Sequence, residues 1–270
     1  MQHTKIEWVR NPDGSPGYSW NPIKGLCPVG CHYCYARRMY QRFRREPALS
    51  WNGTTPLSSH LKPSRIFICS TMEIFHPQIP RLWRNDIFQI IEFPHNRKHT
   101  FIILTKMPER IDRPMPDNVW LGVSVTRPDE LWRWFNIYQI QKAQTKFISF
   151  EPILEQFPGL ALGDLILKTD WLVAGRLTGY GHKYDPTKST LKNIVGMTHG
   201  PVFLKNNLQE IWGKPLIQEF PQEPDETIEY DFPPSCYWCE GKGWIVGHDY
   251  KKHVCPQCKG KGEEEEDDKN

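Results

Sequence analysis

Short apolar runs rich in β-branched and aromatic residues alternate with helical stretches through most of this chain of 270 residues. The expected strands are 65–70, 100–105, 118–125, 146–150, 170–174 and 201–205, and the expected helices are 35–45, 82–93, 128–143 and 189–197. Strands separated by helices favour a parallel sheet with crossover helices. The predicted fold class is therefore α/β, with the sheet open or curled into a partial or full (β/α) barrel.

The cysteines are the second constraint, because seven of the eight fall in two clusters. The first eight residues contain charges and no apolar core, unlike a signal peptide, and no apolar run approaches the roughly 18 residues that span a bilayer. We therefore expect a cytoplasmic protein with no membrane partner, in which clustered cysteines are metal ligands rather than disulfides. The eighth, Cys69, fits a small buried hydrophobe.

The net charge of +3 conceals an asymmetry along the chain. Residues 263–270 hold six acids and one lysine, and the rest has 33 basic against 25 acidic side chains, a net charge of +8. An acidic tail that solubilises the protein explains this, as does a basic body that meets an anionic partner such as nucleic acid. The expected helix 35–45 contains five arginines and fits either a solvated basic surface or phosphate contact.

The first cluster, Cys27, Cys31 and Cys34, has the spacing C-x3-C-x2-C. Three thiolates on one short loop can hold three irons of a four-iron cluster and leave the fourth iron open to a small molecule. Zinc would need a fourth ligand, for which His32 is the nearest candidate. A zinc knuckle and a non-catalytic cluster remain alternatives.

This spacing, with Tyr33 directly before the third cysteine, resembles the signature of the radical S-adenosylmethionine superfamily. The resemblance implies a [4Fe-4S] cluster whose open iron binds S-adenosylmethionine. It also implies reductive cleavage to methionine and a 5′-deoxyadenosyl radical, which takes a hydrogen atom from the substrate. An electron donor such as flavodoxin or ferredoxin is expected, and the barrel would be of the radical S-adenosylmethionine type.

More of the chain resembles a poorly characterised radical-S-adenosylmethionine-like family common in phages and prophages. The matching stretches, across roughly 4–206, are KIEW at 5–8, WNP at 20–22, CYARRM at 34–39, CSTMEIFH at 69–76, LTKMPER at 104–110, VWLGVSV at 119–125, FISFEPIL at 147–154 and FLK at 203–205. One turn departs from the family pattern: a Gly-Gly-Glu-Ser type of turn is replaced by GRLTG at 175–179, which introduces Arg176. This departure puts any role of the turn in doubt and can mark a different substrate.

Ligands of parallel α/β folds bind beyond the carboxyl ends of the strands, where the resembling stretches place polar residues. Glu73, with help from Ser70 and Thr71, is the candidate acceptor for the ammonium group of S-adenosylmethionine. Candidates for its ribose or for the substrate are Ser124 and Glu151. Candidates for a carboxylate or phosphate of the substrate are Lys106, Arg176 and Lys205. Each of these also fits a solvated strand end or a structural ion pair, and no catalytic residue is assigned.

The second cluster consists of two C-x2-C-x-G-x-G knuckles, Cys236 with Cys239 and Cys255 with Cys258. Four thiolates suit one tetrahedral zinc ion, and the pattern resembles one zinc unit of DnaJ-type chaperones. A redox dithiol pair and a second iron–sulfur cluster are the alternatives. The expected organisation is a catalytic domain at 1–217, a linker at 218–234, a zinc module at 235–262 and a disordered acidic tail at 263–270.

Together these features predict a radical S-adenosylmethionine enzyme. The basic body and the phage resemblance favour a nucleic-acid or nucleotide base as its substrate, for instance in rearrangement or modification of a phage DNA base in a bacterial host. The alternative is a non-catalytic nucleic-acid-binding protein in which both clusters are structural metal sites.

Overall fold

The computed structural model describes residues 1–53, 57, 61–140, 143, 145–158, 168–222, 244–246 and 252–254. The chain divides into two compact units, Met1–Gln222 and Glu223–Asn270. Within the described residues, no helix is both long and apolar enough to cross a membrane.

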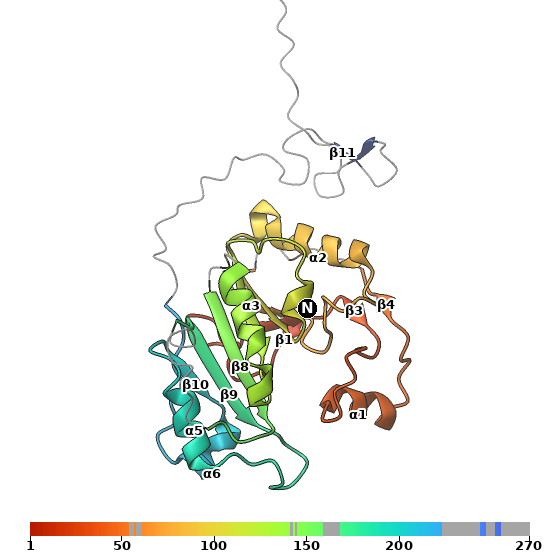
Figure 1. The fold of residues 1–270 in the computed structure, drawn as a ribbon. Coiled ribbons are helices and arrows are strands. Elements are labelled where there is room, and N and C mark those ends of the chain that lie inside the picture. Colours follow the sequence, from red (N-terminus) through yellow and green to blue (C-terminus); the bar gives the residue numbers. More distant parts are fainter. Residues whose placement is uncertain are drawn as a thin grey trace, which may run out of the picture. The chain divides into compact units, whose positions relative to one another are not determined.

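One mostly parallel sheet of eight strands organises the first unit (Figure 1). Its order is β1 (Gln2–His3), β2 (Tyr18–Trp20), β5 (Arg65–Ile68), β6 (Thr100–Thr105), β7 (Val119–Ser124), β8 (Thr145–Ile153), β9 (Trp171–Arg176) and β10 (Val202–Leu204). Only β1 pairs antiparallel to its neighbour. The predicted α/β class is confirmed. The two outermost strands, β1 and β10, do not pair with each other, so the described sheet is not a closed barrel.

Helices connect several of these strands, as the alternation in the sequence predicts. They are α1 (Tyr35–Arg42), α2 (Arg81–Glu92), α3 (Trp132–Ile140), α5 (Lys188–Val195) and α6 (Gln209–Trp212), and a small strand pair, β3 (Ile23–Lys24) with β4 (Ser50–Trp51), flanks α1. The helix predicted at 128–143 begins instead as a separate 3-10 turn, Pro128–Glu130. The helix predicted at 35–45 stops at Arg42, before Arg44 takes a left-handed φ of 47°.

The two faces of the sheet are buried against different partners. Alternate strand residues such as Ile66, Ile103 and Leu121 form one core with the apolar sides of α2, α3 and α5. The intervening residues point to the other face, where Phe67, Trp120, Phe147, Trp171 and Phe203 pack around Trp8 from the N-terminal segment. Because both faces are covered, most strand residues are apolar, with buried exceptions such as Ser19 in β2 and Ser149 in β8.

Two parts of this architecture were not predicted from the sequence. The strand β2 has only three residues, too few for a periodic signal, yet it lies inside the sheet between β1 and β5. Gln218 and Phe220, expected in the linker, belong to the first unit: Gln218 forms a β-bridge with Phe203, and the ring of Phe220 packs on Trp171. The apolar ring of Phe220 gains burial there despite the neighbouring prolines.

The second unit is described only at a short antiparallel pair, β11 (Trp244–Val246) with β12 (Lys252–Val254). Trp244 lies opposite Val254 in this pair. The four cysteines predicted to bind zinc, Cys236, Cys239, Cys255 and Cys258, lie outside the described residues.

Candidate metal centre

The three N-terminal cysteines lie on a loop between β3 and α1, near the carboxyl end of β2. Cys34 directly precedes α1, and its backbone N–H donates to the Cys31 carbonyl over 3.1 Å. Gly25 and Gly30 have φ angles of 107° and 72°, a region that residues with a side chain rarely adopt. These turns return the loop on itself, so that its cysteines face a common space.

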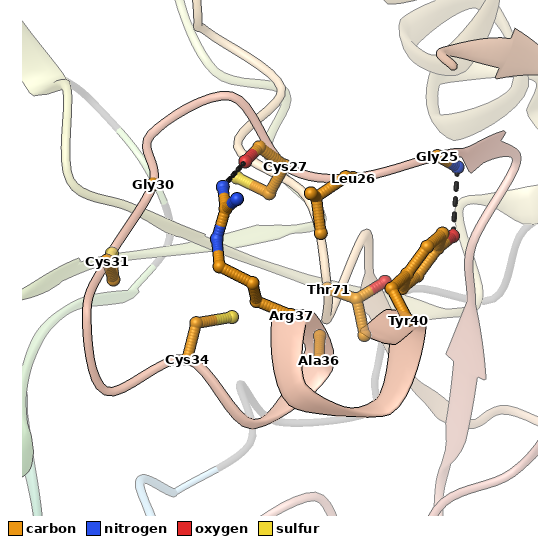
Figure 2. Close-up of a pocket in the computed structure, with 10 residues that line it drawn as sticks. All are labelled: Gly25, Leu26, Cys27, Gly30, Cys31, Cys34, Ala36, Arg37, Tyr40 and Thr71. Atoms are coloured by element: carbon orange, nitrogen blue, oxygen red, sulfur yellow. Dashed lines mark hydrogen bonds between the residues drawn. The ribbon is translucent and has the colours of Figure 1, made fainter. Parts of the chain in front are cut away.

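That space is an open pocket lined by Cys27, Cys31 and Cys34 together with Thr71 from the segment after β5 (Figure 2). The structure thus brings the three predicted ligands to one cavity. In the part of the chain that the structure describes, no three Cys, His, Asp or Glu side chains are grouped to hold a single metal ion.

Two backbone N–H groups are directed at the Cys27 sulfur. Burial raises the pKa of the Cys27 thiol, whereas hydrogen bonds from the backbone N–H groups of Val29 and Glu73 lower it. Hydrogen bonds to cysteine sulfurs are among the levers by which proteins tune iron–sulfur clusters. The donor set therefore fits a three-cysteine cluster.

Arg37, on the first turn of α1, lies along the same pocket. Its guanidinium donates to the Cys27 carbonyl over 3.3 Å, and Figure 2 shows the side chain extending from α1 to that carbonyl. On the opposite side of the loop, the Tyr40 hydroxyl accepts a hydrogen bond from the Gly25 N–H over 3.0 Å. Two α1 side chains thus hold the N-terminal part of the cysteine loop.

Glu73 is buried between the ends of β5 and β6, 6% exposed. Its Oε1 accepts hydrogen bonds from the Thr105 hydroxyl at 2.8 Å and the Phe75 N–H at 3.1 Å, and its Oε2 accepts from the Lys106 N–H at 2.7 Å. Burial raises the pKa of this carboxyl, and these donors act in the opposite direction. A carboxylate oxygen offers two acceptor sites, so Oε2 retains one.

Tyr33 and Lys106 form the next part of the site. The Lys106 ammonium lies 5.5 Å from the centre of the Tyr33 ring. Burial raises the pKa of Tyr33, as do the negative charge of Cys31 and the hydrogen bond to its thiol. Burial lowers the pKa of Lys106, while the charge of Cys31 raises it. Both predicted residues therefore lie beside Cys31.

A pair missed by the sequence reasoning, Glu130 and Arg133, lies in the same region. Glu130 accepts from the Thr126 N–H and hydroxyl and pairs with Arg133 at 2.8 Å. Arg133 also donates to the carbonyl of Ser124, 2.9 Å away. Burial alone would raise the pKa of the Glu130 carboxyl. The hydrogen bond from the Thr126 N–H and the charge of Arg133 outweigh burial, so the pKa is lowered. The TRPDE stretch after the apolar run ending at Val125 was the available signal, because acids favour a helical N-terminus.

Glu151, near the end of β8, and Lys205, directly after β10, form an ion pair with each other across β9. The indole N–H of Trp8 donates to the second Glu151 oxygen. The charges of Glu151 and Lys205 both act on the pKa of Tyr35, which burial raises. The pair therefore lies on the side of the pocket where α1 begins.

The remaining predicted residues have structural partners. Arg176 forms ion pairs of 3.0 Å with Asp185 and with Glu210, so its positive charge is balanced by two acids. The Ser70 hydroxyl donates to Asn21 and joins the ends of β5 and β2. Cys69 is buried, as expected, and burial raises the pKa of its thiol to about 12.

The loop that follows Arg176 reaches the cysteine loop, a contact that the sequence did not indicate. The Tyr180 hydroxyl donates to the His32 carbonyl over 3.0 Å. Arg38 of α1 donates to the Thr178 carbonyl and lies over the Tyr180 ring at 4.9 Å. His32 itself is exposed, with its ring edge-on to Tyr33.

Comparison with known proteins identifies one family. A family model described as a protein of unknown function (DUF5131) matches residues 3–191. The chain belongs to this family. The region matched to DUF5131 includes the cysteine loop, Glu73, Lys106 and Glu151, while Lys205 and the four C-terminal cysteines follow it. No curated protein and no solved structure gave a match.

Proposed function

We propose that this chain is a radical S-adenosylmethionine enzyme, built on a partial (β/α) barrel, that acts on a nucleic-acid or nucleotide base. The observation that supports this most directly is the convergence of Cys27, Cys31 and Cys34 on one open pocket at the carboxyl edge of a mostly parallel sheet. In a four-iron cluster each cysteine binds a different iron, so the thiols need to line one cavity rather than meet at one point.

A [4Fe-4S] cluster with S-adenosylmethionine would supply the electron transfer and the radical chemistry that no side chain provides. The chain's own residues bind and orient. The three cysteines would hold the cluster, with the Val29 and Glu73 amides hydrogen-bonded to the Cys27 sulfur. Glu73 Oε2 would accept a hydrogen bond from the ammonium of S-adenosylmethionine, since it keeps one acceptor site.

The polar groups around the pocket would position the rest of the ligands. Lys106 is a cationic group against the Tyr33 ring and suits a carboxylate or phosphate. Ser124 is buried at the end of β7 and would bind the ribose of S-adenosylmethionine or the substrate through its hydroxyl. Glu151 and Lys205 would contact substrate as a pair, because neither charge is available alone. Arg176 would act on a substrate only through the turn that it stabilises.

Anaerobic reconstitution tests the proposal. The wild-type chain should bind about four irons at the first cluster, and a reductant with S-adenosylmethionine should yield 5′-deoxyadenosine. Replacing Cys27, Cys31 and Cys34 together by alanine should remove this iron and the product. Cys69→Ala is the matched control, because it removes a cysteine outside the pocket and should leave both unchanged.

The C-terminal cysteines need a separate arm, since we propose that Cys236, Cys239, Cys255 and Cys258 hold zinc. Alanine at all four should remove zinc while the first cluster keeps its iron. If the triple alanine variant at Cys27, Cys31 and Cys34 retains the wild-type iron content, the enzyme proposal fails. A folded protein that binds metal and nucleic acid but gives no 5′-deoxyadenosine would indicate the non-catalytic alternative.

A further inference from the structure

The outer side of α1 and the turn after it expose apolar and basic side chains together. Tyr35 and Phe43 are each 54% exposed and Met39 is 37% exposed. Arg38, Arg42 and Arg45 are exposed beside them. We call these six residues the α1 face. Burying large apolar side chains is favourable, so their exposure on one short helix indicates a surface that meets a partner.

The arginines of this region have no acidic partners within the described part of the chain. Among the described residues, none of the five arginines at 37, 38, 42, 44 and 45 forms an ion pair with a carboxylate. The first turn of α1 has no acid either. The positive charge of the α1 face is therefore available to an anionic partner.

Several of these arginines stack on aromatic rings. Arg42 and Arg45 lie over the Phe43 ring at 5.5 and 5.4 Å from its centre. Arg38 lies over the Tyr180 ring at 4.9 Å. Guanidinium groups next to exposed rings combine phosphate contacts with platforms on which unpaired bases stack.

The α1 face also borders the pocket, because Tyr35 follows the ligand Cys34 directly. A chain bound along α1 would thus reach the edge of the cysteine loop. Duplex DNA offers phosphates to such a surface but keeps its bases stacked, so the exposed rings favour an unpaired strand.

We propose that the α1 face binds single-stranded nucleic acid and leads it to the cysteine pocket. The delivery of the strand to the pocket rests on the proposed function, but the binding itself needs no metal or cofactor. Its failure and that of the enzyme proposal can therefore be observed separately.

The test is fluorescence anisotropy with a labelled single strand of about 12 nucleotides and a duplex of the same sequence, titrated with the full chain between about 50 and 200 mM salt. The single strand should bind more tightly than the duplex. Phe43→Ala should weaken single-strand binding roughly ten-fold with little change in salt dependence. Arg42→Gln with Arg45→Gln should weaken it at least as much and reduce the salt slope by about 1.4.

Lys188→Gln with Lys192→Gln is the matched control, because it removes the same charge from exposed positions on α5. The inference would be overturned if this control lost as much single-strand affinity as the double arginine variant. It would also be overturned if the duplex bound as tightly as the single strand and Phe43→Ala did not alter either affinity. The inference would also be overturned if the protein bound polyglutamate or phosphatidylglycerol-containing vesicles in place of the single strand, and if that binding depended on Phe43. Iron content of the same variants reports on the cluster separately and should equal that of the wild type.

Discussion

The indole N–H of Trp8 donates a hydrogen bond to the Glu151 carboxylate over a nitrogen–oxygen distance of 3.2 Å. The ring of Trp8 meanwhile packs against Phe67, Phe147 and Trp171. One side chain near the N-terminus therefore fills the core on one face of the sheet and orients an acid at the edge of the candidate site. The stability of the fold and the geometry of the site are coupled through it.

Replacement of Trp8 should reveal both contributions. Trp8→Phe keeps an aromatic ring but loses the donor, so it should lower the free energy of unfolding by about 1–3 kcal/mol. Trp8→Ala also empties part of the core and should cost roughly 3–5 kcal/mol. Urea denaturation followed by circular dichroism measures both. Equal stability of Trp8→Phe and the wild type would show that the hydrogen bond contributes nothing.

Gly122 on β7 should not tolerate a side chain, because an added Cβ would lie 2.3 Å from the ring of Phe147 on the adjacent strand. Gly122→Ala should therefore destabilise the protein by about 1–3 kcal/mol, as overpacking of a core does. Phe147→Leu in the same chain should restore part of the loss in thermal unfolding. If the two effects simply add, the clash is not the cause.

His99 should make stability depend on pH. Its ring is 1% exposed, both ring nitrogens are without a hydrogen-bond partner among the described residues, and burial lowers its pKa from 6.5 to about 4. Between these values the unfolded chain binds a proton that the folded chain does not, so stability falls as the pH decreases from 6.5 towards 4. The loss should reach about 3 kcal/mol.

Urea unfolding at several pH values measures this loss, with His99→Leu as the comparison. The variant should lack this part of the slope, because it has no imidazole to protonate. An identical pH profile in the variant would assign the slope to other groups.

Glu73→Gln should destabilise the strand ends, because an amide has one acceptor oxygen where the carboxylate has two. The amide nitrogen would face either the Lys106 N–H or the Phe75 N–H and Thr105 hydroxyl, at a cost of about 1–3 kcal/mol. Thr105→Val removes one donor to Glu73 and also the acceptor of the Met107 N–H, so it should cost a similar amount. Unfolding midpoints compare both variants with the wild type, and a Glu73→Gln midpoint equal to that of the wild type would contradict this account of the network.

The sequence by itself determined the longer strands and helices and the cysteine loop. The run 100–105 is apolar and β-branched, and it forms β6 with the predicted bounds. Cys27, Cys31 and Cys34 share one loop because they lie within eight residues, which turn at Gly30 in a left-handed conformation and cannot separate them far. Local residue preferences suffice for such features.

Only the tertiary structure decided which distant residues meet. Glu73 contacts Thr105 because β5 and β6 are neighbours, and Tyr180 reaches the His32 carbonyl because the loop after β9 extends to the cysteine loop. Strand order is set by the burial of both sheet faces together, a property of the whole chain. A contact across 148 residues, such as that of Tyr180 with His32, leaves no local pattern in the sequence.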